Sequence, residues 1–157
     1  MSEVAEGTQD DLLLERQLCF ALTVASRSVV GAYKPVLENL GLTHPQYLVM
    51  LCLWESSPRS VRDISAALAQ EPATISPLLR RLETAGLITR QRVPGDERTL
   101  AVDLTPLGAA LREQATAVPG TMMDLLGLTR EQVGQLHAAM MGLIAATKTA
   151  AGDSPRR

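Results

Sequence analysis

The only thiols of the chain are those of Cys19 and Cys52. A thiol attacks electrophiles and oxidants as the thiolate, so a reactive cysteine needs neighbours that lower its pKa from about 8.5. If Cys19 lies on a helix, Arg16 three residues before it and Thr23 four residues after it project from neighbouring turns of one face. Arg16 would then supply positive charge and Thr23 a hydroxyl donor. This spacing makes Cys19 a candidate reactive thiol.

A structural role for both cysteines is the alternative. A lone cysteine on an apolar helix face is often a small buried hydrophobe, and for Cys19 this alternative stays open. Cys52 lies inside the apolar run 48–54 and is interpreted as a core residue. The two thiols lack metal-ligand spacing, and in a reducing compartment they do not indicate a structural disulfide. Without a Cys-x-x-Cys pair, P-loop or dinucleotide fingerprint, we expect neither a thiol enzyme such as a peroxidase, nor a metal, nor a cofactor.

A second set of residues that could bind a partner is a group of arginines in the middle of the chain. Residues 58–98 hold seven arginines and five acidic residues, a net charge of +2, whereas the rest of the chain is net −4. The planar guanidinium fork suits phosphates, guanine edges and narrow minor grooves. The alternative is that these arginines only form a solvated surface on a helix and a turn. The acidic overall balance, with a pI of about 5.7, therefore does not exclude nucleic acid as a partner.

Helices and one hairpin are expected to position these side chains. Apolar periodicity and caps predict helices over 12–40, 43–54, 60–68, 74–85, 105–118 and 129–150. Thr74 is the expected N-cap of the fourth helix, which tolerates Pro77 in the first turn, and Pro119 with Gly120 interrupts the fifth. Alternating residues predict strands at 87–93 and 99–104 around a charged turn. Two short helices followed by a hairpin are typical of a winged helix-turn-helix.

The fold class expected is therefore mainly α with a small β-hairpin wing, in one domain covering 1–157. Residues 46–105 would form the DNA-binding part, and 12–40 with 106–150 a helical dimerisation part, since apolar stripes at both chain ends need a second core. Every apolar run is far shorter than the roughly 18 residues that a membrane span needs. The first residues do not show the basic segment followed by an apolar core that is typical of a signal peptide. We expect a cytoplasmic protein that does not contact a membrane.

Specific segments resemble a known family. Residues 93–99, Val-Pro-Gly-Asp-Glu-Arg-Thr, resemble the D-x-R wing signature of the MarR family of dimeric winged-helix regulators. Residues 73–88 look like its recognition helix and first wing strand. Within the family, Leu-Cys-Phe-Ala-Leu at 18–22, Pro-Gln-Tyr-Leu-Val-Met at 45–50 and Leu-Trp-Glu at 53–55 resemble the OhrR branch of organic-hydroperoxide-sensing repressors.

The resemblance implies a homodimer that represses from a pseudo-palindromic double-stranded DNA operator and releases it when an organic hydroperoxide oxidises the sensor cysteine. Carried over by position, Cys19 is the sensor and Tyr33 hydrogen-bonds its thiolate. Thr23 and His44 stand where the branch usually has tyrosine. Tyr33 and His44 are expected to come from across the dimer; a protonated His44 would be the stronger thiolate partner, a neutral one only another donor. With no neighbouring thiol, the sulfenic acid would be capped by a small external thiol or oxidised further.

The DNA contacts are expected from the residue types and from their places in the winged helix-turn-helix. Arg98 at the wing tip is expected to enter a minor groove, with Asp96 orienting it. The residues expected to contact the major groove and phosphates are Thr74, Ser76, Arg80, Arg81, Arg90 and Arg92. The alternative function is a MarR-type regulator released by a small phenolic or lipid ligand bound between the helical base and the winged domains, with Cys19 structural.

Overall fold

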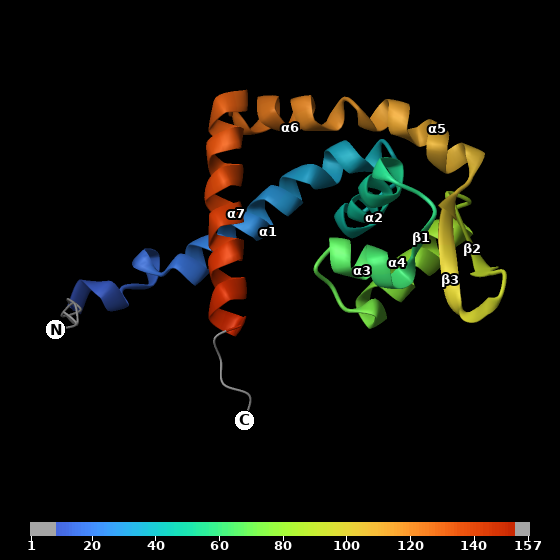
Figure 1. The fold of residues 1–157 in the computed structure, drawn as a ribbon. Helices are drawn as coiled ribbons and strands as arrows, with labels where there is room; N and C mark the ends of the chain where they lie inside the picture. Colours follow the sequence, from blue (N-terminus) through green and yellow to red (C-terminus); the bar gives the residue numbers. More distant parts are fainter. Residues whose placement is uncertain (1–8, 153–157) are drawn as a thin grey trace. The chain divides into compact units, whose positions relative to one another are not determined.

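The computed structural model describes residues 9–152, which fall into two compact units divided between residues 116 and 117. The elements run along the chain as shown in Figure 1. They are the 3-10 turns η1 (Gln9–Leu12) and η2 (Leu14–Arg16), helix α1 (Leu18–Glu38), α2 (His44–Glu55), strand β1 (Arg59–Ser60), α3 (Val61–Ala67), α4 (Pro72–Thr84), β2 (Ile88–Val93), β3 (Asp96–Leu104), α5 (Pro106–Ala115), α6 (Val118–Leu126) and α7 (Arg130–Gly152). The predicted fold class, mainly α with a small wing, is confirmed.

Local capping fixes most helix starts where the sequence predicted them. Thr43 and Gln46 form a reciprocal capping box at α2, with backbone to side-chain distances of 3.4 and 3.0 Å. Thr129 and Gln132 do the same at α7, at 3.2 and 2.9 Å. The Ser60 hydroxyl accepts the N–H of the third residue of α3 at 3.0 Å. Each cap depends on residues three apart, which is why the sequence alone locates it.

Helix α4 begins earlier than predicted. Its N-cap is Glu71, and Pro72 occupies the first helical position, where a missing N–H costs nothing. Thr74 is therefore not the N-cap, and the prediction was wrong on this point. Pro77 lies inside the helix and leaves the Ala73 carbonyl without its usual donor four residues on.

Two other boundaries also differ from the sequence-based prediction. The first long helix begins at Leu18 rather than at residue 12, because Gln17 is extended (φ −77°, ψ 124°) and separates η2 from α1. Pro119 and Gly120 do not end a helix. They lie in the first turn of α6, where proline is tolerated, so α6 is an additional helix that the sequence analysis missed.

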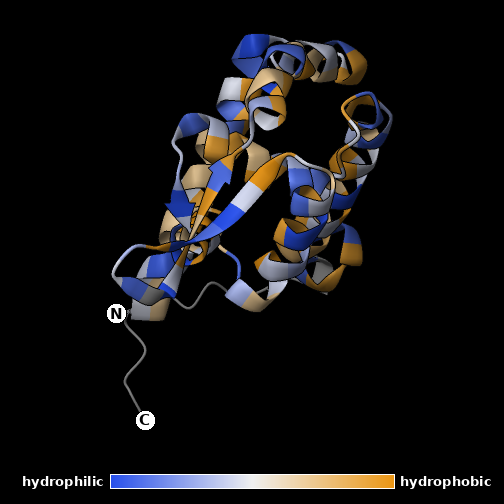
Figure 2. Ribbon diagram, turned by 90° about the vertical axis from the view of Figure 1, so that its right-hand side faces the viewer, coloured by the Kyte–Doolittle hydropathy of each residue, from blue (hydrophilic) through white to orange (hydrophobic). Residues whose placement is uncertain are grey.

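The wing is the hairpin of β2 and β3, and it belongs to a three-stranded antiparallel sheet of order β1-β3-β2. The two-residue strand β1 pairs with Val102 and Ala101 of β3, and this third strand was not predicted. Pro94 and Gly95 form the turn, Gly95 with φ +87°, which glycine adopts without strain. Figure 2 shows both hydrophilic and hydrophobic stretches along the strands of this sheet.

The core of the first unit lies between the helices and the base of the sheet. Helix α2 buries five residues, whereas its Leu51 is 40% exposed. Other side chains exposed by less than 2% come from α1, α3, α4 and the sheet: Leu37, Ile64, Ile75, Leu79, Leu82, Ile88 and Val102. Helix α5 is attached by the Trp54 indole, which donates to the Gly108 carbonyl at 2.9 Å. This packing holds α4 and the wing on one body.

Candidate functional site

Helix α4 presents a polar face opposite its buried one. Ile75, Leu79 and Leu82 point inward, which leaves Thr74, Arg80 and Arg81 exposed. The half-buried Ser76 donates its hydroxyl to the Pro72 carbonyl at 3.0 Å. Three of the four α4 residues expected to contact DNA are thus accessible with free side-chain ends, while the Ser76 hydroxyl is already used within the helix.

The wing turn is fixed by Asp96. Its carboxylate accepts the Thr99 hydroxyl at 2.6 Å and the Arg98 backbone N–H at 3.1 Å. These two bonds, the Thr99 bond first, hold the pKa of the Asp96 carboxyl below its usual value. Asp96 therefore orders the backbone from which Arg98 projects. It does not bind the Arg98 guanidinium.

Arg90 connects the wing to α4. Its guanidinium makes a bidentate pair with Glu83, at 3.1 and 3.3 Å, and lowers the pKa of that carboxyl. The pair occupies the Nε–Nη2 edge of the guanidinium, so a phosphate contact from Arg90 would use its remaining Nη N–H groups. Arg92, also on β2, is exposed.

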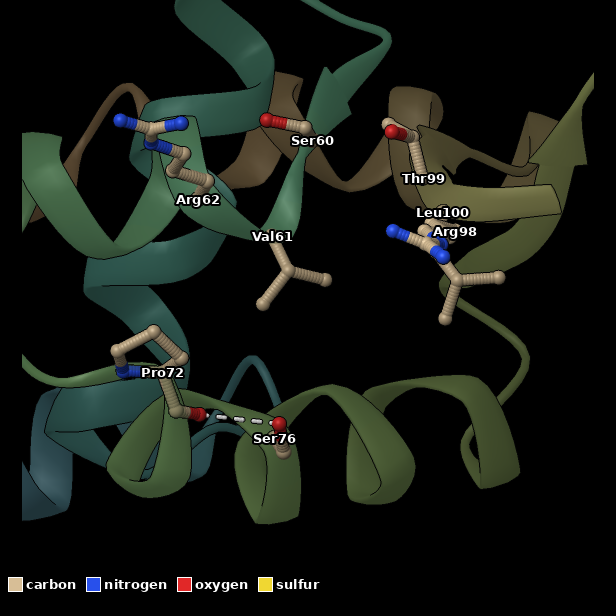
Figure 3. A pocket seen from close by; sticks show the side chains of 8 residues that line it. All are labelled: Ser60, Val61, Arg62, Pro72, Ser76, Arg98, Thr99 and Leu100. Atoms are coloured by element: carbon tan, nitrogen blue, oxygen red, sulfur yellow. Dashed lines mark hydrogen bonds between the residues drawn. The ribbon is translucent and has the colours of Figure 1, made fainter. Parts of the chain in front are cut away.

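A hollow of about 480 Å³ opens beside α4, and Figure 3 shows the side chains around it. Its walls come from the start of α3, the start of α4 and strand β3. The lining residues are Ser60, Val61, Arg62, Pro72, Ser76, Arg98, Thr99 and Leu100. Arg62 was not among the predicted DNA contacts, although the count of arginines between 58 and 98 included it.

The candidate reactive thiol, that of Cys19, lies near the N-terminal end of the first unit. Cys19 is exposed in the first turn of α1. The neighbours predicted for it are placed differently: Arg16 belongs to η2, before the extended Gln17, so it does not share the helix face. The Thr23 hydroxyl donates to the Cys19 carbonyl at 2.7 Å, so its proton is not offered to the sulfur.

Tyr33 and His44 form a ring cluster away from Cys19. Their ring centroids lie 5.1 Å apart at 56°, and Tyr47 packs on the same tyrosine at 6.0 Å. Cys19 and Tyr33 share the continuous helix α1 but are separated by about 21 Å of helical rise at 1.5 Å per residue. One chain therefore does not bring the predicted sensor residues together.

Burial lowers the pKa of His44. Within one chain this favours the neutral imidazole, the second of the two forms considered for it. As the pH falls, this histidine is protonated in the unfolded chain before it is protonated in the folded chain. The free energy of unfolding therefore has its full value above about pH 6.5 and decreases below that pH.

When the pH falls from about 7.5 to 5.5, we expect the free energy of unfolding to decrease less in His44→Gln than in wild type. Urea unfolding midpoints at the two pH values measure this, with His137→Gln, which removes an exposed histidine from α7, as the matched control. Equal losses in wild type and His44→Gln would show that His44 contributes nothing to the acid sensitivity.

The second thiol is of a different kind. Cys52 is buried on α2, with 6% of its surface exposed. Burial raises the pKa of the Cys52 thiol, Glu55 and Asp63 add to the rise, and Arg59 opposes it. Within residues 9–152 the structure shows no group of three potential metal ligands. Over the same described range, every helix is too short or too polar to cross a membrane.

Comparison with known proteins identifies this arrangement. The family model described as "MarR family" matches residues 42–100, from just before α2 to the middle of β3. The organic hydroperoxide resistance transcriptional regulator of Bacillus subtilis (strain 168) is 41% identical over 139 residues, covering 88% of this chain and 95% of that protein. The chain belongs to the MarR family. It is a DNA-binding transcriptional regulator and not an enzyme.

Solved MarR-family structures agree with this assignment. Reduced AbfR bound to DNA, a Staphylococcus epidermidis protein, matches with a TM-score of 0.78 and 30% identity, covering 90% of this chain and 97% of that one. CouR from Rhodococcus jostii RHA1 bound to p-coumaroyl-CoA matches with a TM-score of 0.70 and 25% identity, covering 84% of this chain and 94% of that one. In this MarR-family protein, α4 and the β2–β3 hairpin thus correspond to the reading head of a winged helix-turn-helix.

Proposed function

We propose that this protein represses transcription by binding an operator and releases it when an organic hydroperoxide oxidises Cys19. The observation that carries the proposal is the contrast between its two thiols. Cys19 is exposed in a first helical turn, whereas Cys52 is buried with a raised pKa. The Bacillus subtilis relative, an organic hydroperoxide resistance regulator, supports the choice of oxidant.

The chemistry needs only the thiolate and the peroxide. The Cys19 sulfur attacks the terminal peroxide oxygen, an S–O bond forms, the O–O bond breaks, and the alcohol leaves with a proton. Sulfur is oxidised by two electrons to the sulfenic acid. A small external thiol then condenses with it to a mixed disulfide and water, because Cys52, exposed by only 6%, is not positioned to resolve it.

A dimer would complete the sensor site. The faces of α1 and α7 carry exposed apolar side chains, among them Leu18, Phe20, Val24, Leu136, Met140 and Ile144, and Val133 and Leu143 add to the α7 stripe. Burying such faces against a second copy is the usual reason for them. Tyr33 and His44 of the partner would then approach Cys19, with Tyr33 hydrogen-bonding the thiolate and neutral His44 packed on its ring.

The domain layout follows from the same proposal. Residues 46–105 bind DNA, while 12–40 and 106–150 form the dimer base. A two-fold dimer reads a pseudo-palindromic operator. Since the DNA of a bacterial regulator lies in the cytoplasm, we place the protein there. The residues proposed to contact the major groove and the phosphates are Thr74, Ser76, Arg80, Arg81, Arg90 and Arg92.

Arg98 is expected to enter the minor groove beside the wing. We expect Arg98→Ala to weaken operator binding by about 1–3 kcal/mol and to flatten the preference for bases at the operator flanks. Fluorescence anisotropy with an operator selected from random duplexes, and with flank-substituted duplexes, measures both effects. Arg112→Ala on α5, which removes an equal charge, is the control. Full affinity with unchanged flank preference in Arg98→Ala would refute the wing role.

Regulation by a bound small molecule is the second candidate, and the CouR structure with p-coumaroyl-CoA keeps it in view. The thiol proposal is tested by treating the protein with one equivalent of cumene hydroperoxide and trapping sulfenic acid with a cyclic dione. We expect the label on Cys19 and none on Cys52. Label on Cys52 alone, or on neither thiol, would contradict a Cys19 sensor and favour the ligand mechanism.

A further inference from the structure

The hollow beside α4 lies where DNA must pass between two parts of the reading head. Helix α4 enters a major groove and the wing the adjacent minor groove, so the sugar-phosphate backbone that separates the grooves crosses between α4 and β3. The hollow has walls from both elements, Pro72 and Ser76 on one side and Arg98 to Leu100 on the other. Figure 3 shows Arg98 on the β3 side and Arg62 on the wall formed by the start of α3.

The hydrogen-bond donors around the hollow are of two kinds. The Thr99 hydroxyl already donates a hydrogen bond to Asp96 at 2.6 Å, and the Ser76 hydroxyl donates one to the Pro72 carbonyl at 3.0 Å. The Ser60 hydroxyl oxygen accepts a backbone N–H, and its own O–H remains able to donate a hydrogen bond. Among the side chains that the structure describes, those of residues 9–96 and 98–152, none forms a hydrogen bond or ion pair with the Arg62 or the Arg98 guanidinium.

The described lining residues also carry charge of one sign. Arg62 and Arg98 are among these eight residues, and none of the eight is acidic. A guanidinium binds a phosphate through two parallel N–H bonds, and it does so most strongly where no carboxylate competes. Arg90, by contrast, is engaged by Glu83. Of the two arginines that line the hollow, Arg62 is the one on the helix side of the backbone path.

We propose that the hollow seats a backbone phosphate of the bound DNA and that Arg62 is a phosphate-contacting residue. This inference rests on DNA binding and not on the thiol, so it stands or fails independently of Cys19. Arg62 works from the α3 side of the backbone, while Arg98 remains directed to the minor groove from the β3 side. The contact fixes the position of the reading head and carries no base information.

The test is the salt dependence of binding by Arg62→Gln. Each phosphate contact adds about 0.9 to the slope of log K against log salt, so the loss of one contact per protomer lowers the slope by about 2 for a dimer. The affinity should fall by a similar factor for the selected operator and for an unrelated duplex. Arg112→Gln, which removes the same charge from α5, should keep the wild-type slope.

Several outcomes would overturn the proposal. An unchanged slope in Arg62→Gln means that Arg62 touches no phosphate, and a loss confined to the operator means that it reads bases. An equal drop in Arg112→Gln would indicate a general charge effect. Arg62 is exposed, so the variant should retain the wild-type thermal midpoint, which shows that any change in slope is not due to unfolding. If the hollow takes only free phosphate, inorganic phosphate at constant ionic strength changes binding while the slope of the variant stays wild type.

Discussion

Cys19→Ser is expected to bind the operator as wild type does and to stay bound after hydroperoxide treatment. The serine hydroxyl is not ionised at neutral pH and does not attack the peroxide, so the sulfenic acid that begins the response never forms. In wild type the same treatment should weaken binding by about 5- to 150-fold, the range of ordinary coupling between two sites. Anisotropy titrations of the operator with and without cumene hydroperoxide measure the difference.

Cys52→Ser is the matched control for this comparison. It removes the buried thiol and should leave the response to hydroperoxide intact, although burying a hydroxyl in place of a thiol lowers stability. Release by Cys19→Ser that equals release by wild type would remove Cys19 from the mechanism. The small-ligand alternative would then be the account to pursue.

Gly108→Ala is expected to destabilise the winged domain by about 3 kcal/mol and to lower Tm by about 6–12 °C. A Cβ at Gly108 would lie 2.0 Å from the Leu87 carbonyl oxygen and 3.0 Å from its carbon, both backbone atoms. That oxygen also accepts the Thr105 N–H at 3.1 Å, so neither it nor α5 moves freely. The clash outweighs the gain of about 1 kcal/mol that alanine brings to a helix.

Trp54 allows the effect of Gly108→Ala to be measured at α5 itself as well as through Tm. It is the only tryptophan of the chain, and its indole donates to the Gly108 carbonyl. Displacement of α5 in Gly108→Ala should therefore shift the emission of Trp54 to longer wavelength. Gly120→Ala on α6, where nothing lies within 4 Å of the added atom, is the control. A Gly108→Ala protein with wild-type Tm and emission would show that the contact is loose.

The sequence predicts those parts of the fold that depend on neighbours along the chain. The caps at Thr43, Ser60 and Thr129 were located correctly because each joins residues three apart. The start of α4 was placed wrongly because Thr74 looked like a cap, whereas Pro72 is better suited to the first helical position. Strand β1 has two residues and exists only because β3 pairs with it, which no local pattern reveals.

The site was predictable to a similar degree. Residue types placed Arg80, Arg81 and Arg98 on exposed surfaces of the reading head, as the structure has them. The sequence did not reveal that Glu83 engages Arg90, since this pair depends on how β2 returns along α4. It also did not single out Arg62, whose place at the hollow depends on packing among α3, α4 and β3.

The central claim is that oxidation of Cys19 releases the operator. The most direct measurement is a stepwise titration of the protein–operator complex with cumene hydroperoxide, in which anisotropy and the mass of each cysteine-containing peptide are read from the same samples. The account predicts that the bound fraction falls in proportion to the fraction of reduced Cys19 while Cys52 remains a thiol. Operator still bound when Cys19 is fully oxidised, or released while Cys19 is still reduced, would contradict it.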